Sequence, residues 1–240
     1  MRDMGRNIDG SGGSGGRGGR SGRTVVAVVL ALAACGESKP ETGPSSAAPA
    51  APAAPAVVFL GTSLTAGYGI GADLAYPALI QHQLDSAGLG YRVVNAGVSG
   101  ETSAGGLRRL EWLLKEPVAV LVLELGANDG LRGQDVDSME ANLRAIVGRT
   151  RATYPDARIV IAGMQAPPNM GRQYAQRFRQ VFPRLAEETD AALIPFLLEG
   201  VAAVDSLNLP DGKHPTAAGH AIIAETVWGV LEPELRKGRS

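Results

Sequence analysis

A serine, an aspartate and a histidine in this sequence have the types and spacing needed for nucleophilic catalysis. Ser63 follows an apolar run that ends at Gly61, and Asp211 precedes His214 by three residues in the segment DGKHP. A serine hydroxyl becomes an effective nucleophile when an imidazole accepts its proton, and a carboxylate fixes the tautomer of that imidazole. The pattern therefore predicts acyl transfer at a carbonyl carbon, with Ser63, His214 and Asp211 as a catalytic triad.

Acyl transfer also needs hydrogen-bond donors for the negative charge that develops on the carbonyl oxygen. The segments NAGVSGETS and ELGANDG follow two further apolar runs and contain Gly97 and Asn128. The expected oxyanion donors are the backbone N–H groups of Ser63 and Gly97 and the side-chain amide of Asn128. A glycine suits this role at position 97, because no side chain then stands between its N–H and the substrate.

From residue 57 onward, apolar runs alternate with helical periodicity. Strands are expected in the apolar runs at 57–60, 91–96, 118–125, 158–164 and 191–198. Runs that are apolar on both faces are typical of parallel sheets. The expected fold is a three-layer α/β/α sandwich with a five-stranded parallel sheet, and Pro183 is expected to kink the fourth helix. Active sites of such folds lie at the carboxyl ends of the strands, so the polar segments should converge there.

The N-terminal part has the pattern of a secretory signal peptide. An apolar run at 24–34 follows three arginines, ends in small residues, and is shorter than the roughly 20 apolar residues that a transmembrane helix needs. We therefore expect residues 1–34 to be a signal peptide. Its ending, LAAC, resembles the lipobox of bacterial lipoproteins, which implies that Cys35 carries a lipid. An ordinary cleavage site with a chance cysteine and a membrane-retained signal anchor remain open.

Residues 35–56 are rich in proline and alanine and are expected to be a tether between the lipid and a folded domain at 57–240. The expected location is the cell envelope, with the domain exported, lipid-anchored and facing the periplasm. Gly36 after the cysteine resembles outer-membrane sorting, although that rule depends on the organism.

Composition excludes other kinds of site. The chain has 23 basic and 24 acidic residues, so no nucleic-acid partner is expected. With three histidines and one cysteine, it can form neither a disulfide framework nor a Cys/His zinc site. We expect no metal and no cofactor.

Four segments, GTSLTAGYG, NAGVSGETS, ELGANDGLRG and DGKHP, resemble the successive blocks of the SGNH (GDSL-like) hydrolases. The resemblance covers residues 57–235 and is to the bacterial multifunctional thioesterase, arylesterase and lysophospholipase type. It implies a flavodoxin-like fold and a serine esterase that forms an acyl-enzyme. The family's functional residues fall on the positions already named: Ser63, Gly97, Asn128, Asp211 and His214.

The sequence departs from the family block at Thr62, where the usual residue is aspartate. A threonine hydroxyl can still accept a hydrogen bond from a helix-start N–H, so catalysis is expected to survive. Ser99 is a rival nucleophile, but it lacks the full Gly-x-Ser-x-Gly spacing and is expected in a turn. His82 and His220 lie in helical patterns and are expected to be surface or packing residues.

The resemblance implies that the substrate is an acyl ester or a lysophospholipid. The segment 164–178 is rich in methionine, proline and aromatic residues, which predicts an apolar wall for an acyl chain or ordinary loop packing. Its candidate contacts are Met164, Pro167, Met170 and Tyr174. The resemblance adds a mobile loop at 130–135, which contains Leu131.

Two other functions remain open. A carbohydrate deacetylase uses the same residues on acetylated sugars and would cleave acetyl esters with no gain in activity as the acyl chain lengthens. A binding lipoprotein on a decayed hydrolase scaffold is favoured by Thr62 and opposed by the intact Ser63, Asn128, Asp211 and His214. The oligomeric state is not predicted.

Overall fold

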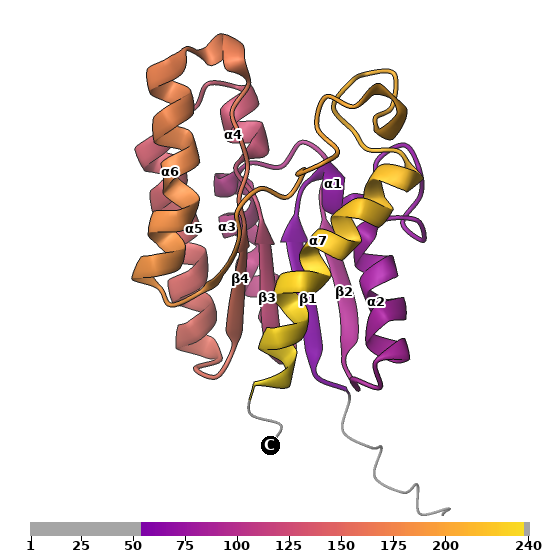
Figure 1. Ribbon diagram of the computed structural model, residues 1–240. Helices are drawn as coiled ribbons and strands as arrows, with labels where there is room; N and C mark the ends of the chain where they lie inside the picture. Colours follow the sequence, from indigo (N-terminus) through magenta and orange to yellow (C-terminus); the bar gives the residue numbers. More distant parts are fainter. Residues whose placement is uncertain (1–53, 238–240) are drawn as a thin grey trace, which may run out of the picture. The chain divides into compact units, whose positions relative to one another are not determined.

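The computed structural model describes residues 54–237, so the predicted signal peptide and Cys35 lie outside the described residues. In the described region, five parallel strands form one sheet in the order β2-β1-β3-β4-β5 (Figure 1). This is the flavodoxin-like order. The strands are β1 (Ala56–Gly61), β2 (Arg92–Gly97), β3 (Val118–Glu124), β4 (Arg158–Ala162) and β5 (Ala192–Ile194).

Helices follow the strands and cover both faces of the sheet. They are α1 (Ser63–Ala66), α2 (Tyr76–Ser86), α3 (Ser103–Leu113), α4 (Ala127–Leu131), α5 (Val136–Thr153), α6 (Arg172–Glu188) and α7 (Ala217–Arg236), with short 3-10 helices η1 (Pro168–Met170) and η2 (Asp205–Leu207). Helices α2 and α7 pack together on one face, and α3, α5 and α6 on the other. In Figure 1, α7 crosses in front of the strands and α3 lies behind them. The expected three-layer sandwich is confirmed.

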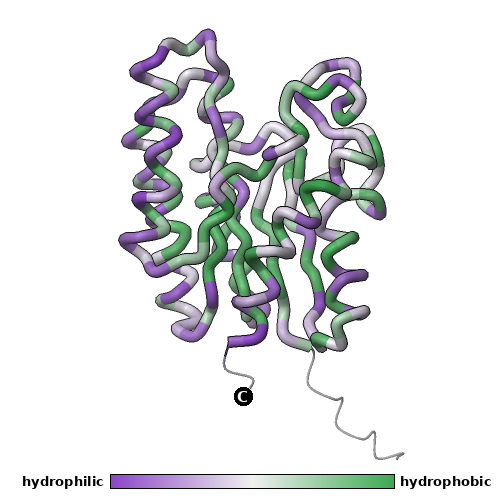
Figure 2. Tube along the Cα trace, viewed as in Figure 1, coloured by the Kyte–Doolittle hydropathy of each residue, from purple (hydrophilic) through white to green (hydrophobic). Residues whose placement is uncertain are grey.

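The sheet forms the core because its strands are apolar on both faces. Every residue of β1 is buried, as are six of the seven residues of β3. Figure 2 shows the strands as hydrophobic and the outer faces of the helices as more polar. Burial of continuous apolar runs between two helical layers is the main stabilising contribution to such a fold.

The fifth strand is shorter than expected. The expected strand at 191–198 is limited to three residues, because Pro195 has no N–H to donate to the sheet. Helix α6 continues through Pro183 to Glu188 as one element, and the proline leaves the carbonyl of Arg179 without its intrahelical donor, so the kink expected there stays a prediction. None of the helices within residues 54–237 has the length and apolar composition needed to cross a membrane.

Candidate active site

Ser63 is the first residue of the short helix α1, directly after β1. Thr62 is the N-cap, and its hydroxyl accepts a hydrogen bond from the N–H of Leu64 at 3.5 Å, as predicted from the sequence. The helix ends after one turn at Gly67, which adopts the left-handed conformation with φ of 74°. The N–H of Ser63 makes no hydrogen bond among the described residues. The hydroxyl and a free N–H are therefore presented together at the end of a buried strand.

His214 and Asp211 reach Ser63 from a loop that precedes α7. Nε2 of His214 lies 2.9 Å from Oγ of Ser63, and Nδ1 lies 2.6 Å from Oδ2 of Asp211. A proton on Nδ1 shared with Asp211 leaves Nε2 as the acceptor for the serine proton. Hydrogen bonds from the imidazole and N–H of His214 and from the N–H of Lys213 hold the pKa of Asp211 well below its usual range. The carboxylate is therefore ionised at neutral pH, as the triad requires.

The loop that carries the histidine is closed by its own hydrogen bonds. The N–H of Leu209 donates to the carbonyl of His214 at 2.7 Å, and Asn208 and Pro215 form an antiparallel bridge. The ring of Tyr68 lies against the imidazole, with 4.4 Å between the ring centroids. These contacts fix the direction of the imidazole before any substrate arrives.

Asn128 lies on α4, directly after β3, the strand that neighbours β1. Its side-chain amide donates one hydrogen bond, at 3.0 Å, to the carbonyl of Glu101 in the segment after β2. The NH₂ group has a second hydrogen, which no described residue accepts. The adjacent Asp129 is buried and accepts two hydrogen bonds from Ser103, at 2.6 and 2.9 Å. Asp129 thus anchors α4 to the start of α3, and Asn128 is held over the strand ends.

The structure does not support Gly97 as an oxyanion donor. Its N–H already donates to Oδ1 of Asn95 at 3.0 Å. A Cβ atom at this position would lie 2.3 Å from the backbone nitrogen of Ala66, so the glycine permits α1 to pack on β2 and does not serve substrate access. Gly100, three residues later, has a φ of 78° and an N–H with no acceptor among the described residues. It immediately precedes Glu101, which holds Asn128.

A buried carboxyl group lies beneath the nucleophile. Glu124 ends β3 with none of its surface exposed and accepts hydrogen bonds from the N–H and hydroxyl of Thr62 at 2.8 and 2.9 Å, and from the hydroxyl of Thr65 at 2.8 Å. Burial is the largest effect and raises the pKa of Glu124 to about 7, although these hydrogen bonds lower it. A side chain at Gly61 would collide with Glu124 and Thr65.

The network continues from Thr65 toward α7. The hydroxyl of Thr65 lies 2.7 Å from that of Tyr76, and the N–H of Tyr76 donates to Nδ1 of His220 at 3.2 Å. His220 is buried, and burial lowers its pKa to about 4, so it is neutral at pH 7. His220 is therefore a packing residue, whereas His82 is exposed.

Three of the residues expected to contact an acyl chain pack against other parts of the protein. Met164 is buried in the core with 5% of its surface exposed, so it offers no wall to a substrate. Tyr174 donates from its hydroxyl to the carbonyl of Gln134 at 2.8 Å, and a Cβ at Gly133 would lie 2.7 Å from Cε of Met170. Both side chains thus pack on the segment 130–135.

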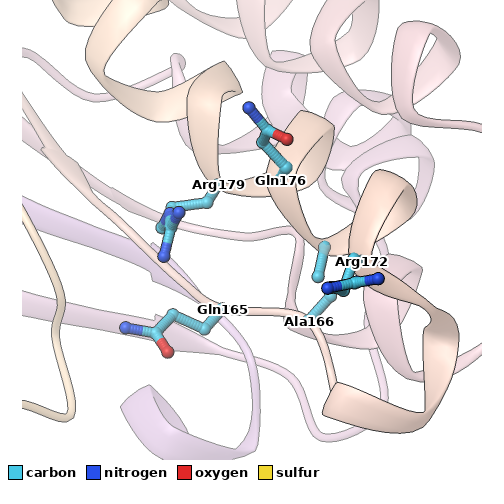
Figure 3. A pocket seen from close by; sticks show the side chains of 6 residues that line it. Gln165, Ala166, Arg172, Gln176 and Arg179 are labelled. Atoms are coloured by element: carbon cyan, nitrogen blue, oxygen red, sulfur yellow. The ribbon is translucent and has the colours of Figure 1, made fainter.

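Two further candidates are accessible from solvent. Leu131 is half exposed, and Pro167 is partly buried just before η1. A cavity of about 330 Å³ lies next to this region, between α6 and the segment that follows β4 (Figure 3). Its lining residues are Gln165, Ala166, Arg172, Ala175, Gln176 and Arg179, none of which the sequence analysis singled out.

Sequence reasoning also missed the residues that support the site. The apolar run at 118–125 includes Glu124, and a carboxylate inside such a run is itself a signal of a buried polar contact. Asn95 links β2 to α1 by donating to the carbonyl of Thr65 at 2.8 Å. No spacing rule identifies Asn95, because its partners are defined only by the pairing of β1 with β2.

Comparisons with known proteins agree with this geometry. The family model of the GDSL-like lipase/acylhydrolase family matches residues 59–222. Esterase TesA of Pseudomonas aeruginosa is 41% identical over 180 residues, which is 75% of this chain and 89% of the relative. The Escherichia coli protein named thioesterase 1/protease 1/lysophospholipase L1 is 40% identical over 179 residues, 74% of this chain and 83% of the relative.

A solved structure extends the likeness to three dimensions. The crystal structure of the psychrotrophic esterase EstA from Pseudoalteromonas, inhibited by monoethylphosphonate, matches with a TM-score of 0.71 and 34% identity, covering 76% of this chain and 99% of that one. The family match at residues 59–222 contains β2 to β5 and the second half of β1, together with Ser63, Asp211 and His214. From its strand order, its strand-end blocks and these relatives, the chain belongs to the GDSL-like (SGNH) lipase/acylhydrolase family and is an ester hydrolase.

Proposed function

We propose that this chain is a lipid-anchored serine esterase that cleaves acyl esters through a covalent acyl-enzyme. The observation that carries the proposal is the hydrogen-bonded line from Ser63 through His214 to Asp211, at 2.9 and 2.6 Å. In the first half of the reaction, Nε2 of His214 takes the serine proton as Oγ attacks the ester carbonyl. The imidazolium then gives that proton to the departing alkoxide, and the alcohol leaves.

The second half repeats the chemistry with water. His214 removes a proton from a water molecule as the water oxygen attacks the acyl carbon, and then returns this proton to Oγ of Ser63 as the acyl–Oγ bond breaks and the carboxylic acid leaves. In both halves, negative charge develops on the former carbonyl oxygen. We assign its donors as the N–H of Ser63, the N–H of Gly100 in place of Gly97, and the free amide hydrogen of Asn128. A single donor of this kind contributes roughly 3 kcal/mol to lowering the barrier.

The proposed substrates are lysophospholipids and short-chain or aryl esters, with thioesters also cleaved in vitro. The names of the two bacterial relatives, an esterase and a thioesterase/lysophospholipase, support this class. A signal peptide at 1–34 and a lipid on Cys35 would place the enzyme at the envelope, where acyl-CoA is not available. The LAAC sequence and the proline-rich segment at 35–56 support that location.

An active-site label tests the covalent mechanism. A fluorophosphonate should modify the wild-type protein and a Ser99→Ala variant equally, and should not modify a Ser63→Ala variant. Peptide mass spectrometry should find the label on Ser63. Labelling that persists in the Ser63→Ala variant and disappears in the Ser99→Ala variant would assign the nucleophile to the rival serine.

Fractionation tests the anchor separately. When the full chain is produced in a bacterium that processes lipoproteins, activity should collect in the membrane fraction, and a Cys35→Ser variant should move to a soluble fraction with unchanged turnover. Equal distribution of both proteins would contradict the lipid anchor and leave the esterase mechanism intact.

A further inference from the structure

The cavity between α6 and the segment after β4 is lined by two arginines whose side chains have no partner among the described residues. Among the arginines within residues 54–237, four form neither an ion pair nor a side-chain hydrogen bond: Arg108, Arg149, Arg172 and Arg179. Two of these four, Arg172 and Arg179, line the same cavity of about 330 Å³, and no carboxylate is among the lining residues. An anion entering the cavity would therefore meet no opposing negative charge at its wall.

The other two arginines of α6 show that this arrangement is not general to the helix. Arg177 pairs with Asp137 of α5 at 2.7 Å, and Arg184 pairs with Glu140 of the same helix. The α5 side of α6 is thus neutralised, whereas the cavity side is not. Figure 3 shows Arg179 and Gln165 at one end of the cavity and Arg172 at the other.

The helix adds to the positive potential at this place. Arg172 is the first residue of α6, and no side chain caps the helix at Gly171. The N–H groups of the first turn therefore have no side-chain partner, and the helix dipole directs partial positive charge toward the same end. A cation at a helix start does not favour the helix itself, so Arg172 is not explained by local stability.

The cavity lies next to the helix that carries Asn128. Ala166 lines it, and the Cα of Ala166 lies 3.6 Å from the point that a Cβ of Gly130 would occupy. Gly130 is on α4, two residues after Asn128. Asn128 and the cavity both follow the carboxyl ends of neighbouring strands, β3 and β4, so they lie on the same side of the sheet.

We propose that the cavity binds the phosphate of a lysophospholipid head group through Arg172 and Arg179, with Gln165 and Gln176 as further hydrogen-bond donors. This inference rests on the esterase function proposed above and adds the part of the substrate that the enzyme recognises. Guanidinium groups bind phosphate oxygens through two parallel charge-assisted hydrogen bonds, and they keep their charge at every physiological pH. The ester is cleaved at Ser63 while the phosphate remains fixed in the cavity.

A matched pair of substrates isolates the phosphate. Octanoyl-lysophosphatidylcholine, used below its micellar concentration, is compared with 1-octanoylglycerol, which has the same acyl ester and no phosphate. In the Arg172→Gln/Arg179→Gln double variant, the KM for the lysophospholipid should rise about tenfold, and the KM for the glycerol ester should stay the same. The Arg108→Gln/Arg149→Gln double variant removes the same charge elsewhere and should match the wild type on both substrates.

The remaining outcomes overturn the head-group site. If the two double variants have the same KM for the lysophospholipid, the cavity does not recognise this substrate. If the KM of the Arg172→Gln/Arg179→Gln variant rises equally for the lysophospholipid and for 1-octanoylglycerol, the cavity does not recognise the phosphate. Inorganic phosphate that inhibits the wild type but not the Arg172→Gln/Arg179→Gln variant, with an unchanged lysophospholipid KM, would assign the cavity to free phosphate instead. Failure of the esterase mechanism is separate, because it would appear as undiminished hydrolysis of 1-octanoylglycerol by a Ser63→Ala variant.

Discussion

The hydroxyl of Thr62 donates a hydrogen bond to the buried carboxyl group of Glu124, 2.9 Å away, immediately before the nucleophile in the chain. The same Thr62 caps α1, so the residue that departs from the family block both begins the nucleophile's helix and satisfies a buried acid. Glu124 takes no part in the catalytic steps, but its carboxyl group holds the residue next to Ser63, so its protonation can affect the position of Ser63.

Replacing the buried acid should change how stability depends on pH. The pKa of Glu124 is raised to about 7 in the folded protein, so the folded state binds a proton that the unfolded state has released at the same pH. The wild type should therefore lose up to about 3 kcal/mol of unfolding free energy between roughly pH 4.5 and 8 through this group. In a Glu124→Gln variant this loss is absent, so its stability relative to the wild type should increase with pH.

Urea denaturation at pH 5, 6, 7 and 8 measures this difference. The exposed Glu111→Gln change is the control and should run parallel to the wild type. Parallel curves for Glu124→Gln and the wild type would show that Glu124 is not titrating in this range.

Restoring the family residue at position 62 should have the opposite effect. A Thr62→Asp variant places a second carboxylate against Glu124, and two neighbouring carboxylates resist double ionisation. Its unfolding free energy should fall more steeply than that of the wild type between pH 6 and 8. A Thr62→Asn variant keeps a capping side chain without the charge and should not show the steeper fall. If the two variants behave alike, charge at position 62 does not couple to Glu124.

The two glycines after β2 should respond differently to alanine. At Gly97, a methyl group meets the backbone of Ala66, so Gly97→Ala should cost about 1–3 kcal/mol of stability. At Gly100 there is space, with Arg132 as the nearest neighbour at 3.6 Å, and the left-handed backbone costs about 1 kcal/mol. Gly100→Ala should instead lower kcat by at least about tenfold with little change in KM, because the oxyanion donor shifts. The opposite result, in which Gly97→Ala lowers kcat more than Gly100→Ala does, would identify Gly97 as the oxyanion donor.

Asp211 should contribute through the orientation of His214. An Asp211→Asn change keeps the size of the side chain but can stabilise the wrong tautomer of the imidazole, so kcat should fall by about 10³- to 10⁴-fold. Circular dichroism and the unfolding midpoint should be nearly unchanged, since the amide oxygen of asparagine can still accept from the N–H groups of Lys213 and His214. A loss below about tenfold would mean that another acceptor holds Nδ1.

The layered fold and the triad could be predicted because each depends on signals that are local in the sequence. Continuous apolar runs identify parallel strands, and the carboxyl ends of parallel strands meet at one edge, which brings Ser63 and the Asp211–His214 loop together. The short fifth strand could have been anticipated from Pro195, since a residue without an N–H cannot continue a sheet.

The oxyanion donor and the supporting network depend on contacts that sequence spacing does not encode. Choosing between Gly97 and Gly100 requires knowing that Asn95 already accepts the N–H of Gly97. The acid under the nucleophile is defined by the register that places Gly61 opposite Glu124. The cationic cavity forms because Arg172 and Arg179, seven residues apart on α6, lie on the side of the helix that faces Gln165.

Ser63 is the proposed nucleophile of this esterase, and every step of the proposed reaction depends on its hydroxyl. The most direct test is the kcat/KM of the wild type and the Ser63→Ala variant on p-nitrophenyl esters from acetyl to palmitoyl, with the unfolding midpoint of both proteins measured alongside. We expect the variant to keep its fold and to lose at least about 10⁴-fold in kcat/KM at every chain length that the wild type cleaves. Equal rates for the two proteins would contradict the account.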